Sequence, residues 1–152
     1  MLFFILFKRL RINHSIIMTG ESGAGKSENA KNVVRYFANV CGTIDDTYVE
    51  RKILACSPIL ESFGNAKTKP NENSSRFGKY LKIDFENQQR ISGASISTYL
   101  LEKSRVVIQG ENESNYHIFY QLCSQRFTDE LKDLYLSNLK NYSYNLKLIF
   151  YK

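Results

Sequence analysis

Hydrophobic and polar residues follow two different periods in the first third of the chain. Residues 15–19 form a short, mostly apolar run that ends at Gly20, which is typical of a buried parallel strand. From residue 26 onwards the apolar residues recur at helical spacing instead, at Ala30, Val33, Val34, Phe37, Ala38 and Cys41. This pattern predicts a strand, a glycine-rich turn and a helix that Gly42 ends.

Two shorter helical segments are expected between residues 45 and 64. Asp45 or Asp46 can cap a helix that runs to about Cys56. Pro58 favours the start of a separate turn, because proline has no backbone N–H with which to continue a helix, and Gly64 closes that turn. The apolar residues of the two segments are Val49, Ile53, Leu54, Ile59, Leu60 and Phe63.

A polar loop at residues 65–76 separates these helices from a predicted hairpin. Such a long loop inside a compact domain indicates function. Apolar and polar residues alternate over residues 80–85, and residues 91–101 are expected to run back as the antiparallel partner. Helical spacing returns at residues 115–123 and 127–139. The mixture of strands and helices predicts an α/β fold.

Composition excludes several classes of protein without identifying one. The chain has 152 residues, 43% of them hydrophobic and 24% charged, which is globular rather than disordered composition. Three cysteines without a CxxC pair and two separate histidines argue against a disulfide framework or a metal site built on these residues. The formal net charge is +6, but the basic residues are scattered except at residues 8–11, so nucleic-acid binding is not expected.

The apolar residues at the N-terminus predict neither a membrane span nor a secretory signal. Residues 1–7 are far fewer than the roughly 18 that suggest a spanning helix. The positive charges of Lys8, Arg9 and Arg11 follow the apolar residues, whereas a signal peptide carries its charge before them. We therefore expect no membrane span and reduced cysteines.

A phosphate-binding motif lies between the predicted strand and the first helix. Eight residues fit GxxxxGK(S/T), which a random chain of this length matches roughly once in 200: Gly20, Glu21, Ser22, Gly23, Ala24, Gly25, Lys26 and Ser27. Glycines let successive backbone N–H groups converge on phosphate oxygens, and the helix N-terminus adds partial positive charge. The motif predicts that Lys26 reaches the β- and γ-phosphates of a nucleotide and that Ser27 ligates Mg²⁺.

Five segments, in the same order, resemble the myosin motor head. They are residues 20–29, residues 57–68, a switch I-like Asn-Ser-Ser-Arg-Phe-Gly-Lys at residues 73–79, residues 99–106 and residues 115–122. Ser27 stands where that family usually has Thr, a mild departure that keeps the hydroxyl. The resemblance covers about residues 15–124, whereas residues 1–8 and 125–152 match poorly. It implies that residues 1–152 are a partial motor domain, with an incomplete P-loop NTPase-type sheet and flanking helices.

The resemblance also implies roles for the polar loop before the hairpin. Asn71 and Asn73 would help position the triphosphate, with Asn71 the more direct contact, and Ser74 would hydrogen-bond the γ-phosphate and the attacking water. Ser75 would be the second protein ligand of Mg²⁺. Arg76 would form the ion pair that closes switch I against switch II. The implied catalytic set is Lys26, Ser74 and Arg76, and the block Glu102, Lys103 and Arg105 would be a salt-bridged scaffold.

Several parts of a motor head are not recognisable in this sequence. No DxxGFE-type switch II supplies a glutamate for Arg76, and Asp84 ends a strand at the wrong place for a Walker-B carboxylate. The adenine-contacting segment, the lower half of the actin-binding cleft, the converter and a light-chain-binding helix are also absent. We therefore expect little ATP turnover by this chain alone.

Three hypotheses follow from the sequence. The first is an ATP-binding fragment of a cytoplasmic motor that, in a complete head, couples Mg-ATP hydrolysis to movement on actin filaments. The second is a truncated, non-catalytic scaffold or interaction fragment. The third is a distinct small P-loop NTPase, which would require a Walker-B-type aspartate that the sequence lacks.

Overall fold

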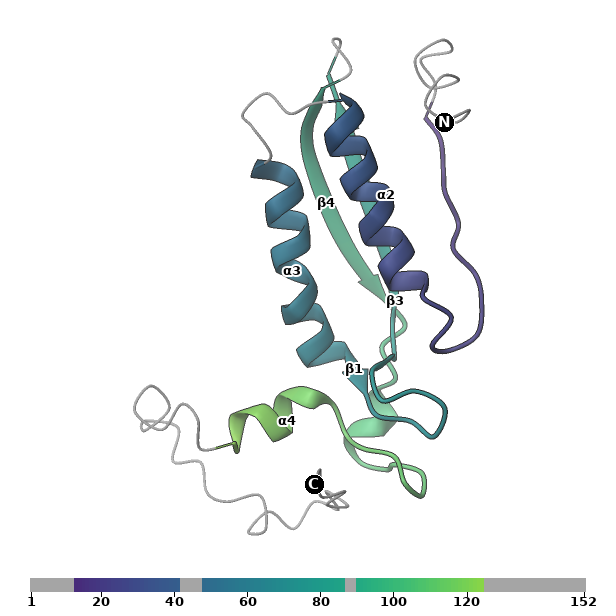
Figure 1. Ribbon diagram of the computed structural model, residues 1–152. Coiled ribbons are helices and arrows are strands. Elements are labelled where there is room, and N and C mark those ends of the chain that lie inside the picture. The colour runs from purple at the N-terminus through teal and green to yellow at the C-terminus, as the bar shows by residue number, and fades with distance from the viewer. Residues whose placement is uncertain (1–12, 42–47, 87–89, 125–152) are drawn as a thin grey trace.

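The computed structural model describes residues 13–41, 48–86 and 90–124, in which two helices lie along a β-ribbon (Figure 1). The elements, in chain order, are α2 (Lys26–Cys41), α3 (Tyr48–Gly64), β1 (Asn65–Ala66), β2 (Ser74–Ser75), β3 (Gly78–Phe85), β4 (Ile91–Tyr99), the 3₁₀ helix η1 (Lys103–Val106) and α4 (His117–Leu122). This combination of helices with small antiparallel sheets is a partial α/β fold, as the sequence predicts.

The predicted hairpin is confirmed as the antiparallel pair β3–β4. Its register pairs Gly78 with Tyr99 and Leu81 with Ile96, and an irregularity follows Asp84. The alternation of residues 80–85 suits a ribbon with one covered face, because apolar side chains at every second position reach the same side. α2 and α3 both contact β4, so the helices cover this ribbon (Figure 1).

Helix α2 is confirmed with the boundaries that the apolar spacing predicts. Val34 and Ala38, one turn apart, are its buried residues, and Phe37 packs edge-to-face on Phe85 of β3 with ring centroids 5.8 Å apart. Ile91 at the start of β4 is only 2% exposed and is one of the largest fully buried side chains described. The apolar side chains of α2, the helix that follows the phosphate motif, thus pack this helix against the ribbon.

Helix α3 is a single helix, and the predicted break at Pro58 is wrong. Proline within a helix removes one hydrogen bond and crowds the preceding turn, at a cost of about 3 kcal/mol. Buried residues occur on both sides of it, with Ile53 and Ser57 before and Gly64 at the helix end. We infer that this packing outweighs the local cost. The predicted caps Asp45 and Asp46, like Gly42, lie outside the described residues.

The segment before the phosphate motif is not a strand. Residues 15–19 have no regular secondary structure, and the side chains of Ile16 and Ile17 are 46% and 83% exposed. A parallel strand forms only beside a neighbouring strand that shares its hydrogen bonds. None of the described residues provides such a neighbour, which explains why an apolar run alone did not produce the predicted strand.

The polar loop is more ordered than predicted. Its two ends pair as β1 and β2, with Asn65 opposite Ser75 and Ala66 opposite Ser74. Ala66 also forms an isolated antiparallel bridge with Tyr116, just before α4. The predicted helix at 115–123 is confirmed in its centre as α4, whereas the predicted helix at residues 127–139 lies outside the described residues.

A substitution at Gly64 tests how tightly the end of α3 meets the loop. A Cβ at this buried glycine would collide with the ring of Phe77, whereas a Cβ at Gly93 in β4 meets nothing within 4 Å. We expect Gly64→Ala to lower the free energy of unfolding by about 1–3 kcal/mol. The matched control Gly93→Ala should stay within about 0.5 kcal/mol of the unaltered chain in urea unfolding. Equal stability of the two variants would contradict this packing.

Candidate nucleotide-binding site

The phosphate motif forms a loop that only glycine accommodates without strain at three positions. Gly20, Gly23 and Gly25 have φ values of 147°, 85° and 84°, a region that residues with a Cβ rarely adopt. The N–H of Asn29 donates to the carbonyl of Gly25 at 2.9 Å, so helical hydrogen bonding begins at the last of these glycines. The loop therefore opens directly into the N-terminus of α2, where backbone N–H groups are free to bind an anion.

Lys26 lies over its own loop. Its Nζ donates to the carbonyl oxygens of Gly20 and Glu21, each at 2.6 Å. An ammonium group has three N–H donors, and these two contacts leave one for another acceptor. The positive charge is thus held beside the loop backbone, where it complements the partial charge of the helix N-terminus.

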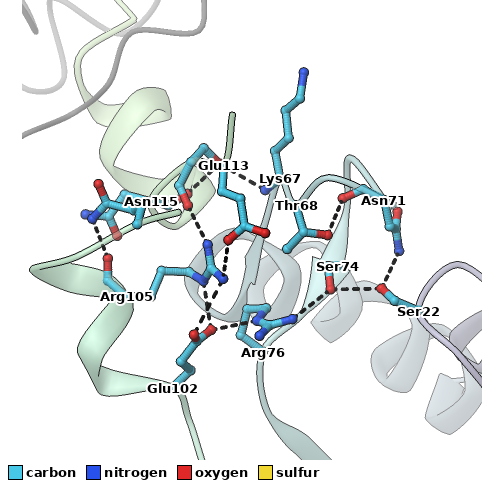
Figure 2. Close-up of polar contacts among 12 residues, drawn as sticks. Ser22, Lys67, Thr68, Asn71, Ser74, Arg76, Glu102, Arg105, Glu113 and Asn115 are labelled. Carbon is cyan, nitrogen blue, oxygen red and sulfur yellow. Dashed lines mark hydrogen bonds and ion pairs between the residues drawn. The ribbon is translucent and has the colours of Figure 1, made fainter. Parts of the chain in front are cut away.

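The phosphate loop contacts the polar loop that precedes the β3–β4 hairpin. The Oγ atoms of Ser22 and Ser74 are 3.0 Å apart although the residues are 52 positions apart, and Nδ2 of Asn71 donates to Oγ of Ser22 at 3.3 Å (Figure 2). The structure therefore brings together three of the predicted binding residues from two distant segments. Ser74 is 2% exposed, whereas Ser22 is exposed, so the contact between them is partly buried.

The turn that carries Asn71 is held by backbone contacts. The N–H of Thr68 donates to the carbonyl of Asn71 at 2.8 Å, and the Thr68 hydroxyl donates to the same oxygen at 3.1 Å. The N–H of Asn73 donates to Oδ1 of Asn71 at 3.0 Å, which leaves the Asn71 Nδ2 directed at Ser22. Ser114 fixes the base of the turn, because its backbone and side chain bond both polar groups of the Lys67 backbone.

Asn73 belongs to a different set of contacts from Asn71. Its Nδ2 donates to the carboxylate of Glu61 at 3.3 Å, and its Oδ1 accepts from Nδ2 of Asn65 at 3.0 Å. Nε2 of His117 lies 3.0 Å from the same Oδ1, so His117 donates through Nε2. The Asn73 side chain therefore ties the loop to α3 and α4, and its contact with a triphosphate stays a prediction.

Arg76 is paired within this chain. Its Nε donates to Oε2 of Glu102 at 2.6 Å, and its Nη1 donates to Oγ of Ser74 at 3.3 Å (Figure 2). Glu102 also accepts from Nε of Arg105 at 2.8 Å, and Nη2 of Arg105 reaches Oε2 of Glu113 at 3.0 Å. Glu102 and Arg105, two of the three residues of the predicted charged block, are thus salt-bridged, and their network reaches the polar loop through Arg76.

Burial and charge act in opposite directions in this network. Burial disfavours the ionised form of Glu102, but hydrogen bonds and charges from Arg76 and Arg105 outweigh it and lower the pKa of this carboxyl. Burial likewise opposes the charge of Arg105, yet Glu102 and Glu113 raise the pKa of its guanidinium. Both partners remain ionised at neutral pH. The pair Arg76–Glu102 was missed from sequence because its members are 26 residues apart.

The hydroxyls of Ser27 and Ser75 suit a magnesium ion by their availability. Both residues are exposed, and neither hydroxyl bonds another residue of the described ranges. Mg²⁺ prefers oxygen ligands and keeps several waters, so two hydroxyls beside phosphate oxygens fit it. No group of three or more His, Cys, Asp or Glu side chains that could hold a metal occurs in the part of the chain that the structure describes. No hydrogen bond among the described residues joins Ser27 to Ser75, so their pairing around one ion stays a prediction.

A glycine-rich loop that opens into a helix and carries a lysine and a serine defines a P-loop protein. The chain belongs to the myosin head (motor domain) family, whose model matches residues 5–149. Unconventional myosin-Va of Homo sapiens is 58% identical over 132 residues, which cover 87% of this chain. Unconventional myosin-Vb of Homo sapiens is 55% identical over 132 residues and the same 87%. Unconventional myosin-VI of Sus scrofa is 49% identical over 137 residues, or 90% of this chain.

The chain spans only a small part of these relatives. The matched residues cover 7% of each myosin-V protein named above and 11% of myosin-VI. Within the residues that the structure describes, no helix has the length and apolar character needed to cross a membrane.

The burial of His117 predicts that stability falls in mild acid. Burial lowers the pKa of His117 from its usual 6.5, and the nearby Glu61 charge offsets this only in part. As pH falls below about 6.5, the unfolded chain binds a proton that the folded chain resists, so unfolding becomes easier. The midpoint temperature of thermal unfolding should therefore fall more steeply from about pH 7.5 to 5.5 in the unaltered chain than in His117→Gln, whose side chain at this position cannot titrate. Superimposable pH profiles of the two proteins would refute the expectation.

Proposed function

We propose that this chain binds Mg-ATP as the phosphate-binding part of a myosin-type motor domain. The observation that carries the proposal is the 3.0 Å contact between Ser22 of the phosphate loop and Ser74 of the second loop. A nucleoside triphosphate needs one loop for its β-phosphate and another that senses the γ-phosphate. The contact brings these two loops to the same place. The family match over residues 5–149 supports assigning the chain to one motor domain.

Each binding residue has a distinct role in this proposal. Lys26 and the backbone N–H groups of residues 20–27 neutralise the phosphates, and Ser27 with Ser75 holds Mg²⁺ alongside them. Asn71 and Ser74 contact the γ-phosphate side, and Asn73 holds their loop in place. When bound, Mg²⁺ neutralises charge on the phosphate oxygens. These residues act by position and electrostatics, and none of them forms a covalent intermediate.

We further propose that the complete protein is an actin-based motor of the cytoskeleton. Support comes from the names of the relatives, which are unconventional myosins, and from their high identity over this region. The actin-binding surface and the parts that turn hydrolysis into movement would lie elsewhere in such a protein, because this chain matches only 7–11% of the relatives named above.

Removal of the Lys26 charge tests the nucleotide site. We expect the full chain to bind Mg-ATP saturably in isothermal titration calorimetry, and Lys26→Ala to weaken binding at least about tenfold, since a charge-assisted contact to phosphate is lost. Lys82→Ala is the matched control, because Lys82 is exposed on β3 and pairs with Asp84 away from the loop. Equal affinities of the two variants, or no saturable binding by the unaltered chain, would overturn the proposed function.

Hydrolysis by this chain alone should be slow even where binding is tight. The sequence contains no DxxGFE segment, and Arg76 is paired with Glu102, so the elements that would enclose the attacking water are incomplete. In a single-turnover assay we expect phosphate release close to the rate without protein. Motor-like turnover by the isolated chain would show that closure by a further segment is not required.

A further inference from the structure

Glu102 joins a buried arginine to the phosphate loop through a continuous series of polar contacts. Its Oε2 accepts from Nε of Arg105 and from Nε of Arg76 at 2.8 and 2.6 Å. Arg76 in turn donates through Nη1 to Ser74, whose Oγ lies 3.0 Å from that of Ser22. Figure 2 shows this series running from the η1 side of the molecule to the phosphate loop.

We propose that Glu102 is a positioning residue that fixes Arg76 and, through Arg76, directs the hydroxyl of Ser74 at the phosphate loop. The inference rests on the proposed nucleotide site and adds a residue to it. In the described residues the Glu102 carboxylate pairs with Arg76 and Arg105 and forms no hydrogen bond with the phosphate loop or Ser74, so its effect passes through the arginine.

Glu102 is itself held firmly enough to act as an anchor. The side chain of Arg105 is only 5% exposed and adds a second contact from Nη2 to Oε1 of Glu102 at 3.5 Å. The hydroxyl of Tyr116 donates to the Glu102 carbonyl at 2.7 Å, and the Glu102 N–H donates to the carbonyl of Arg76 at 3.0 Å. Glu102 and Arg76 are therefore joined through both main chain and side chain, which reduces the rotamer freedom of a long arginine.

The charge of Glu102 also determines what Arg76 can do. An arginine fork binds phosphate strongly, so an unpaired Arg76 beside the loop would turn towards a bound triphosphate. With Nε on Glu102, the guanidinium offers Nη1 to Ser74 instead. Donation from a cation polarises the Ser74 hydroxyl and makes it a better donor to an anionic oxygen. By pairing with Arg76, Glu102 thus prevents a direct contact between this arginine and phosphate and orients the Ser74 hydroxyl instead.

The chain offers a matched control in Glu113. Glu113 accepts from Nη2 of Arg105 at 3.0 Å, and among the described residues it forms no hydrogen bond or ion pair with Arg76. Glu113→Gln therefore removes the same charge from the same network and leaves the Arg76 contact in place. A purely structural role for the network predicts similar consequences for Glu102→Gln and Glu113→Gln.

The first measurement follows the Arg76 side chain without nucleotide. In ¹H–¹⁵N NMR of the full chain, the Arg76 Nε–H signal, assigned by its loss in Arg76→Lys, should be protected from solvent exchange. We expect Glu102→Gln to abolish that protection and Glu113→Gln to retain it. Glu102→Asp, which keeps the charge but is one methylene shorter, gives the same comparison if the glutamine variant fails to fold. Unchanged protection in the Glu102 variants would overturn the inference.

The second measurement compares Mg-ATP with Mg-ADP by calorimetry, because the Ser74 contact acts on the γ-phosphate side. Glu102→Gln should lower the ratio of ATP to ADP affinity about tenfold, Glu113→Gln should leave it unchanged, and Glu102→Gln should add nothing to Arg76→Ala. Equal effects of both glutamine variants, or an added effect in the Arg76→Ala background, would overturn the positioning role. If the unaltered chain binds no Mg-ATP, the proposed function fails, while selective loss of the Arg76 signal still supports the Glu102–Arg76 contact.

Discussion

The burial of the Arg105 guanidinium is the constraint on which the polar half of this structure depends. A buried charge is costly unless it is paired and hydrogen-bonded. Arg105 meets this requirement by donating to Glu102, Glu113 and the carbonyl of Ser114. The N–H of Ser114 in turn donates to the carbonyl of Lys67 in the polar loop. A single side chain therefore draws together the segments that position the second loop of the candidate site.

Apolar burial organises the rest of the described structure and is limited in extent. The buried apolar residues are Val34, Ala38, Ile53, Ala66, Ile91 and Tyr116. Val34, Ala38, Ile53 and Ile91 belong to α2, α3 and β4. Ala66 and Tyr116 belong to the bridge between β1 and the residue before α4. Large apolar side chains such as Leu100 and Ile108 remain 93% and 75% exposed. A chain that matches 7–11% of the relatives named above is expected to expose surface that further segments cover in a complete head.

The features that could be predicted from the sequence are those determined by residues close together in the chain. The φ values of the motif glycines follow from the need for a Cβ-free backbone, and α2 and the β3–β4 hairpin follow from apolar spacing. Tertiary packing decided the other cases. Helix α3 continues past Pro58 because residues on both sides of the proline are buried. Residues 15–19 form no strand because no neighbouring strand pairs with them in the described structure. The pair Arg76–Glu102 could not be predicted at all, because no local pattern links a loop arginine to a glutamate 26 residues later.

The contact between Ser22 and Ser74 joins two loops that are 52 positions apart in the sequence, and this bears on how the proposed site would bind a phosphate. Ordering two distant loops costs conformational entropy, and hydrogen bonds within the chain that hold the loops together reduce that cost. A phosphate oxygen that takes the place of either serine partner exchanges a neutral hydrogen bond for a charge-assisted one, roughly twice as strong. Because Glu102 holds Arg76 and Arg76 holds Ser74, the hydroxyl stays in place during that exchange. In the proposed site, a phosphate would therefore replace one hydrogen-bond partner while the rest of this network holds the loop.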